Sequence, residues 1–246
     1  MSIIDEYESY AIGEESLNDP TLRDDFIALG LNPVTGKGNG RLAALEFDFD
    51  RNTAGQPLDP RQGYTLSTHV ETADNWLGGS FRYNEFVGEG RKYFSLGKRL
   101  VWASRVKAGT LEGSNGAKIP FFKRYFLGGS TSVRGWGRYQ VSPLSPAGLP
   151  FGGRTMAEVS SEGRFLVRGR LSGVVFVDGG NVWAAPGKFG PGGLRWAAGP
   201  GLRYNTPIGP LRIDFGKQLN PIPGLVINGI AEERKWRVHF SIGQAF

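Results

Sequence analysis

Apolar and polar residues alternate with a period of two along most of the chain, and this pattern constrains the fold more than any other feature. The last eleven residues, 236–246, show it most clearly. Successive side chains of a β-strand point to opposite faces of a sheet. The pattern therefore predicts strands with one apolar and one polar face. In the last strand, the predicted apolar face holds Trp236, Val238, Phe240, Ile242, Gln244 and Phe246.

The alternation predicts nine strands, with a tenth and more weakly patterned strand within residues 3–31. A membrane barrel with both ends on one side has an even number of strands, so we favour ten. We find no amphipathic helix, fixed-length repeat or linker. We therefore interpret residues 1–246 as a single β-barrel domain, in which 1–39 form a weakly patterned strand and loop. The nine predicted strands are 45–50, 64–71, 80–96, 100–110, 155–167, 171–183, 194–205, 211–216 and 236–246.

Composition and charge exclude several classes of protein. The chain has no cysteine, which excludes disulfide scaffolds, cysteine-ligated zinc, iron–sulfur clusters and thiol nucleophiles. Mean hydropathy is −0.27, and no apolar run approaches the ~18 residues of a transmembrane helix. The net charge is +6, but the basic residues are scattered among acids. We therefore expect charges that line a cavity or face solvent, and no nucleic-acid partner.

A soluble sandwich also alternates apolar and polar residues, but three features favour a transmembrane β-barrel. The minority face of the strands is charged and rich in glycine. Tight turns at 97–98, 168–169 and 206–209 alternate with long connections, although the connection 51–62 breaks this rule. We predict an all-β, antiparallel transmembrane barrel; the alternative is a soluble all-β binding module for an anionic ligand. Aromatic residues also lie at strand ends, as in an interfacial girdle: Trp183, Trp196, Tyr204, Trp236 and Phe246.

The segment Phe126-Leu-Gly-Gly-Ser-Thr-Ser-Val-Arg-Gly-Trp136, the strand 173–183, the hairpin 199–216 and the terminal Phe246 follow one another in a fixed order. Together they resemble the BamA/TamA-type outer-membrane assembly factors, also called bacterial surface antigens, over roughly residues 40–246. That family implies a sixteen-stranded barrel that inserts barrel proteins or secretes polypeptides, without enzymatic chemistry or a cofactor. The implied partners are outer-membrane lipid, unfolded or nascent outer-membrane polypeptides, and other subunits of the assembly machinery.

The predicted strands match only the C-terminal part of such a barrel. The family's POTRA repeats, signal peptide and about six leading strands are missing from the pattern, and residues 1–20 are acidic without an apolar segment. We expect a fragment or truncated member located in the bacterial outer membrane. A passive pore and a non-functional barrel fragment are the alternatives within this class.

The long connection 111–152 is expected to be an extracellular loop, which folds into the lumen in the family. Side chains alone nearly fill the interior of a closed barrel of about eight strands. Three arrangements follow: the loop stays outside, the sheet is open and completed by another chain, or the natural protein is longer.

The resemblance also assigns roles to individual residues. Arg134 of the loop motif is expected to reach the lumen and pair with Glu162 and Asp178, forming a latch. The alternation by itself predicts that Glu162 points inward, but it does not decide the direction of Asp178. Phe246 is expected to be a C-terminal assembly signal. The other loop-motif residues would let the loop turn and approach the wall closely: Gly128, Gly129, Val133, Gly135 and Trp136.

No catalytic, cofactor or metal site is predicted. The sequence around Ser130 is not the Gly-x-Ser-x-Gly turn of a serine hydrolase, and the glycines of 36–40 lack the spacing of a dinucleotide site. Glu46, Asp48 and Asp50 share one face of a strand at about 6–7 Å spacing, and we interpret them as lining the lumen.

Overall fold

The computed structural model describes residues 1–11, 31–56, 58–113, 119–227 and 229–246. Within these residues, ten antiparallel strands form one sheet in the order of the sequence, as predicted. A two-stranded sheet of β10 (Val226–Ile227) and β11 (Ile230–Ala231) lies outside it. The ten strands are β1 (Ser2–Ala11), β2 (Lys37–Asn52), β3 (Gly63–Ala73), β4 (Tyr83–Ser95), β5 (Leu100–Gly113), β6 (Thr155–Arg168), β7 (Leu171–Trp183), β8 (Arg195–Thr206), β9 (Gly209–Gln218) and β12 (Trp236–Ile242).

Helical structure is confined to three single turns in the described segments: η2 (Asn75–Leu77), η4 (Phe121–Lys123) and η5 (Pro191–Gly193). Among the described residues, no helix has the length and apolar character needed to cross a bilayer.

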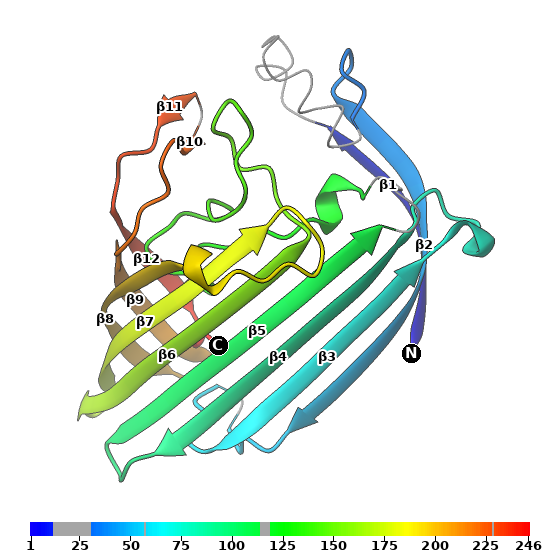
Figure 1. Ribbon diagram of the computed structural model, residues 1–246. Coiled ribbons are helices and arrows are strands. Elements are labelled where there is room, and N and C mark those ends of the chain that lie inside the picture. Colours follow the sequence, from blue (N-terminus) through cyan, green and yellow to red (C-terminus); the bar gives the residue numbers. More distant parts are fainter. Residues whose placement is uncertain (12–30, 57, 114–118, 228) are drawn as a thin grey trace.

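The sheet curls around a concave space, and in the described residues its two edge strands, β1 and β12, do not pair with each other. Figure 1 shows β8, β9 and β12 curving behind β6 and β7. Residues 119–154 of the connection between β5 and β6 lie on the concave side. The sheet is therefore open with the loop on its concave side, and the predicted arrangement in which the loop stays outside was wrong.

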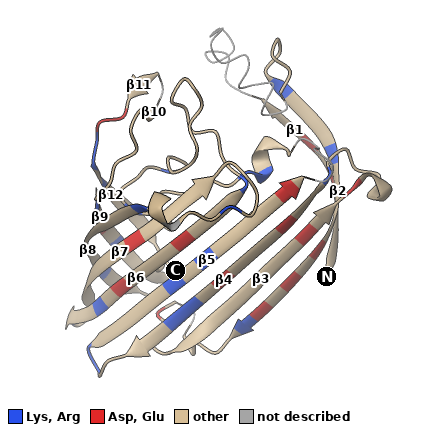
Figure 2. Ribbon diagram, viewed as in Figure 1, with Lys and Arg blue, Asp and Glu red and all other residues tan. Residues whose placement is uncertain are grey.

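The two faces of the sheet differ in polarity as the alternation predicts. The convex face exposes apolar side chains, such as Val175 (57% exposed) on β7 and Phe240 (67%) on β12. On β7, Val174 and Asp178 have the opposite parity to Val175, so they point to the concave face and are buried. Figure 2 shows acidic residues along β2 and β3 and basic residues on the lower parts of β4 and β5. An apolar band on the outside of a charged interior is the pattern of a membrane-spanning β-sheet.

Connections of different length gather at opposite ends of the sheet. The tight turns 96–99, 169–170 and 207–208 lie at the lower end in Figure 1, and the long connections lie at the upper end. The connection between β2 and β3 is long although it lies at the end of the short turns, which is the exception that the sequence predicted. Its first residue is tied to β3, because the Thr53 N–H donates to the Tyr64 carbonyl at 2.9 Å.

The last strand is shorter than predicted, and Phe246 does not face outward. β12 ends at Ile242, and Gly243 adopts a φ of +96°, which turns the chain out of the sheet. Phe246 then enters the concave space, where it is buried with Tyr93 and Ala103. The placement of Phe246 in an outer aromatic girdle was therefore wrong.

Candidate functional site: a buried charge network beneath the inward loop

The inward loop, residues 119–154, packs against the concave face of the sheet. Short β-bridges within the loop hold its backbone folded on itself. Val133 and Trp136 are fully buried in a hydrophobic cluster that the loop shares with the strands. Gly128 and Gly129 adopt positive φ values, where the motif begins to turn. The predicted loop-motif residues are thus the part of the loop that meets the wall.

Backbone contact between the loop and β9 depends on two glycines. Gly135 has a φ of +100°, and a Cβ on Gly216 of β9 would lie 2.5 Å from the Gly135 nitrogen. Hydrogen bonds fix this approach: the Gly135 N–H donates to His239 Nε2 of β12 at 3.1 Å, and Gln218 Nε2 of β9 donates to the Gly135 carbonyl at 2.8 Å. No side chain fits between the two backbones.

Arg134 lies at the centre of the site. Its Nε and Nη2 donate to the two carboxylate oxygens of Asp178 on β7 at 2.7 and 2.8 Å, and its Nη1 donates to Glu162 on β6 at 3.0 Å. Its guanidinium carbon lies 3.5 Å from the centroid of the Phe176 ring. Forked bonds of this kind are strong and directional. The structure thus brings together the three residues of the predicted latch.

Burial alone would disfavour the charge on Arg134, whose side chain is 1% exposed. The hydrogen bonds and charge of Asp178, with the charges of Glu162 and Asp214, outweigh this desolvation and raise the pKa of Arg134 above its ordinary value. The guanidinium therefore stays charged, and its stability in the interior depends on these carboxylates.

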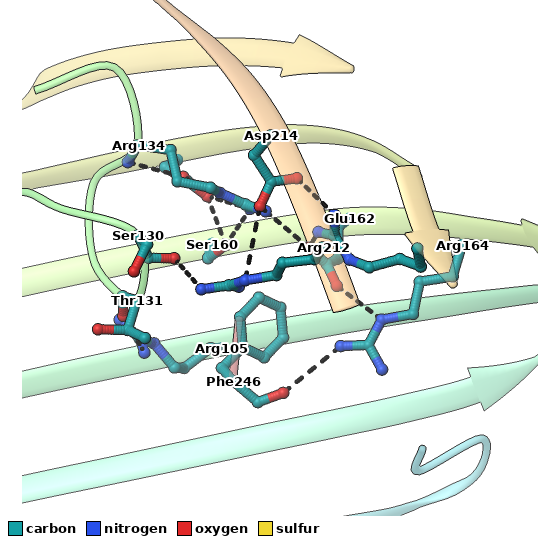
Figure 3. Close-up of polar contacts among 12 residues, drawn as sticks. Arg105, Ser130, Thr131, Arg134, Ser160, Glu162, Arg164, Arg212, Asp214 and Phe246 are labelled. Carbon is teal, nitrogen blue, oxygen red and sulfur yellow. Dashed lines mark hydrogen bonds and ion pairs between the residues drawn. The ribbon is translucent and has the colours of Figure 1, made fainter. Parts of the chain in front are cut away.

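The pairing extends beyond the predicted residues. Arg203 Nη1 on β8 donates to Asp214 on β9 at 2.7 Å, and Arg164 Nε on β6 donates to Glu162 at 2.6 Å. Asp214 also lies 3.6 Å from Arg134 Nη1, and Figure 3 shows it beside Arg134. We call this set the buried charge network, and its members are all at most 6% exposed: Arg134, Arg164, Arg203, Arg212, Glu162, Asp178 and Asp214.

Four members of the network were missed in the sequence: Arg164, Arg203, Arg212 and Asp214. A signal was present, since Arg203, Arg212 and Asp214 each occupy the polar parity of a strand whose other face is apolar. Charges at that parity must point into the concave space. What the sequence did not reveal is that β6, β8 and β9 place them around one point.

Two arginines, one of them a member of the network, hold the backbone of the loop. Arg212 Nη2 of β9 donates to the Ser130 carbonyl at 2.5 Å, and Arg105 Nη1 of β5 donates to the Thr131 carbonyl at 3.0 Å. Figure 3 shows both contacts, together with the Phe246 ring beside Arg105. The motif is therefore fastened to strands on both sides of the concave space, from β5 to β12.

A second attachment of the loop lies above β3. Lys123 Nζ, in η4, pairs with the Glu71 carboxylate at 2.6 Å, and the Tyr125 hydroxyl donates to Glu85 on β4 at 2.8 Å. Burial, followed by the charge of Glu85, raises the pKa of Tyr125 above its ordinary value, so the hydroxyl stays a donor. These contacts anchor the start of the loop, as Arg134 anchors its middle.

The acids of β2 and β3 form the one group of potential metal ligands in the described segments. The ligand atoms of Glu46, His69 and Glu71 lie within 4.8 Å of one another. His69 Nδ1 also contacts Asp48 at 2.7 Å, whereas Asp50 is exposed and outside the group. Because Lys123 already pairs with Glu71, we interpret the group as part of the loop anchor.

The chain is similar in sequence to a known protein family and to several named proteins. A model of the Omp85 superfamily domain matches residues 6–246. The chain is 27% identical over 247 residues to the outer membrane protein assembly factor BamA of Nitratidesulfovibrio vulgaris, covering 99% of the chain and 29% of that protein. It is 27% identical over 248 residues to the chloroplastic outer envelope protein 80 of Arabidopsis thaliana, covering 95% of the chain and 29% of that protein.

A solved structure supports the fold. The crystal structure of BamA from Haemophilus ducreyi lacking POTRA domains 1–3 matches with a TM-score of 0.70 at 18% identity, covering 89% of this chain and 46% of that one. The chain spans less than a third of the length of the two curated relatives above.

Proposed function

The chain belongs to the Omp85 superfamily, and from this premise we propose that it forms part of the wall of an outer-membrane barrel that assembles or translocates other proteins. Its substrates are unfolded or nascent outer-membrane polypeptides, and its action is non-covalent and needs no cofactor. The observation that carries this proposal is the loop motif, which Arg134 fastens to Asp178 and Glu162 inside the sheet.

The convex face supports a location in the outer membrane, with lipid as a direct partner. Large apolar side chains remain exposed along it on strands from β2 to β12, for example Phe47, Val106 and Phe240. A contiguous apolar surface of this kind is unfavourable in water and favourable against hydrocarbon chains.

The edges of the sheet suggest how a polypeptide is handled. An edge strand presents unpaired backbone N–H and C=O groups, to which an extended peptide adds as a further strand. β12 is such an edge in the described sheet. The loop holds β12 in place through His239 and β9 through Gln218, so its attachment controls the rigidity of that edge.

The test is an insertion assay on the protein in its full natural form, reconstituted in liposomes. A small outer-membrane barrel is added unfolded, and its folding is followed by heat-modifiable gel migration. We expect faster folding than with empty liposomes. Arg134→Ala should reduce this acceleration, whereas Arg138→Ala, at an exposed position of the same loop, should not.

Folding of the added barrel at the rate seen with empty liposomes would contradict the proposal. If the same liposomes then conduct ions, the barrel acts as a passive pore. Recovery of the protein as a soluble monomer without detergent would contradict the membrane location.

A further inference from the structure

A small cavity lies at the lower end of the sheet, next to the buried charge network. Its wall contains four arginines: Arg61 from the β2–β3 connection, Arg99 from the β4–β5 turn, Arg164 on β6 and Arg203 on β8. Asp59 is the single acid among the described residues that line it. The cavity volume is about 50 Å³, which accommodates a few water molecules or one small anion and excludes a nucleotide.

Two of these arginines are buried with donors that no protein group accepts. Arg164 is 6% exposed and Arg203 is 2% exposed. Arg164 Nη1, Arg203 Nε and Arg203 Nη2 have no hydrogen-bond partner in the described protein, and the Glu162 carboxylate lies 4.0 Å from Arg203 Nη2. Buried N–H donors are almost always bonded, because an unmade bond costs the full desolvation of the group. Both side chains line the cavity, so an acceptor bound there would lie beside these donors.

The charge balance points to an anionic acceptor rather than a neutral one. Among its side chains, the buried charge network contains four arginines and three carboxylates, one positive charge more than negative, and Arg164 Nη2 also donates to the Phe246 main-chain oxygen at 3.4 Å. At the cavity itself, Arg61 and Arg99 face the single Asp59, which adds a second excess positive charge. An uncompensated buried charge is unfavourable, and an anion beside Arg164 and Arg203 would compensate it.

We propose that this arginine cavity is a binding site for one small tetrahedral oxyanion of the phosphate class. Guanidinium groups present planar, forked donors that match the oxygens of such an anion. Arg164 and Arg203 hold it from the buried side, while Arg61 and Arg99 close the site at the rim. Inorganic phosphate and the phosphate of a lipid head group share this chemistry.

The experiment measures binding calorimetrically on the full protein, folded in detergent and free of phosphate and sulfate. The probes are inorganic phosphate and, separately, a short-chain phosphatidic acid. We expect saturable binding of one oxyanion per chain. Arg203→Gln and Arg99→Gln should each weaken it at least tenfold. The matched control is Arg170→Gln, an exposed arginine at the same end that does not line the cavity, and it should leave the affinity unchanged.

The two probes distinguish the source of the phosphate, because tighter binding of the lipid identifies a head-group site. Heat-modifiable migration verifies that each variant is folded. If Arg203→Gln does not fold, the exposed Arg99 provides the comparison with Arg170. Absence of saturable binding for both probes would overturn the proposal. So would an equal loss in Arg99→Gln and Arg170→Gln, because it would reveal only non-specific attraction to a basic surface.

Discussion

At the scale of single residues, Arg134 shows how a buried charge can position a loop. The guanidinium lies in the interior only because Asp178 accepts two of its hydrogen bonds and Glu162 a third. Each partner belongs to a different strand, so the loop is held only when β6 and β7 are correctly paired. The same dependence makes the contact sensitive to the loss of a single side chain.

Arg134→Ala should release the inward loop. Removing one partner of a buried ion pair costs about 3–5 kcal/mol, because the carboxylates remain buried without their cation. A loss of this size increases the open population of the loop more than a hundredfold. Proteinase K cleavage within residues 119–154 measures it. Arg138→Ala, in which the exposed stacking partner of Tyr139 is removed, is the control. Equal cleavage of the Arg134→Ala variant and the unmodified protein would contradict this account.

Gly216→Ala should also displace the loop, by steric conflict rather than by charge. The added Cβ would lie 2.5 Å from the Gly135 nitrogen, so one of the two backbones must move. Overpacking of this kind costs about 1–3 kcal/mol. A lower urea midpoint of unfolding in detergent is the expected result. Gly90→Ala on β4, where nothing lies within 4 Å of the added Cβ, should leave the midpoint unchanged.

Residue roles could be predicted only where parity was clear. The inward direction of Glu162 follows from its apolar neighbours, but Asp178 shares its face with Val174 and Phe176, which are buried on the concave side. Phe176 faces inward, and the Arg134 guanidinium stacks on its ring. That contact comes from a residue distant in the sequence, and alternation along one strand does not reveal it.

At the scale of elements, the sequence predicted the strands well where apolar and polar residues alternate without interruption. The limits 171–183 predicted for β7 agree with the structure, whereas β2 begins at Lys37, well before the predicted 45. Gly38 and Gly40 carry no side chain to signal a face, so the pattern was weak there although the backbone pairs with β1. At the other end, the turn at Gly243 shortened β12.

A charge on the convex face should oppose insertion of a strand into a bilayer. Val177 lies near the middle of β7 and is 45% exposed. Val177→Arg should destabilise the folded protein in bilayers by about 2–4 kcal/mol. Ser67→Arg, near the middle of β3 but on the concave parity, should have a much smaller effect. Equal losses in both variants would show that the convex face does not contact lipid.

At the scale of the whole molecule, two surfaces of opposite character are separated by one layer of sheet. The convex surface is apolar, and the concave surface holds the loop, the buried charge network and the arginine cavity. The strand count and the family could be predicted from the sequence. The curvature that brings β6, β8 and β9 around Arg134 could not, because it arises from the pairing of all ten strands.

We infer that the convex face contacts lipid while the concave face contacts water. Because the chain has no cysteine, single cysteines can report on each face. Val175→Cys lies on the convex face, and Thr65→Cys lines an interior cavity of about 490 Å³. The measurement is the labelling rate of each variant in membranes with a water-soluble maleimide. We expect rapid labelling of Thr65→Cys, whereas Val175→Cys should react only with a membrane-soluble reagent. Equal labelling of both positions from water would contradict it.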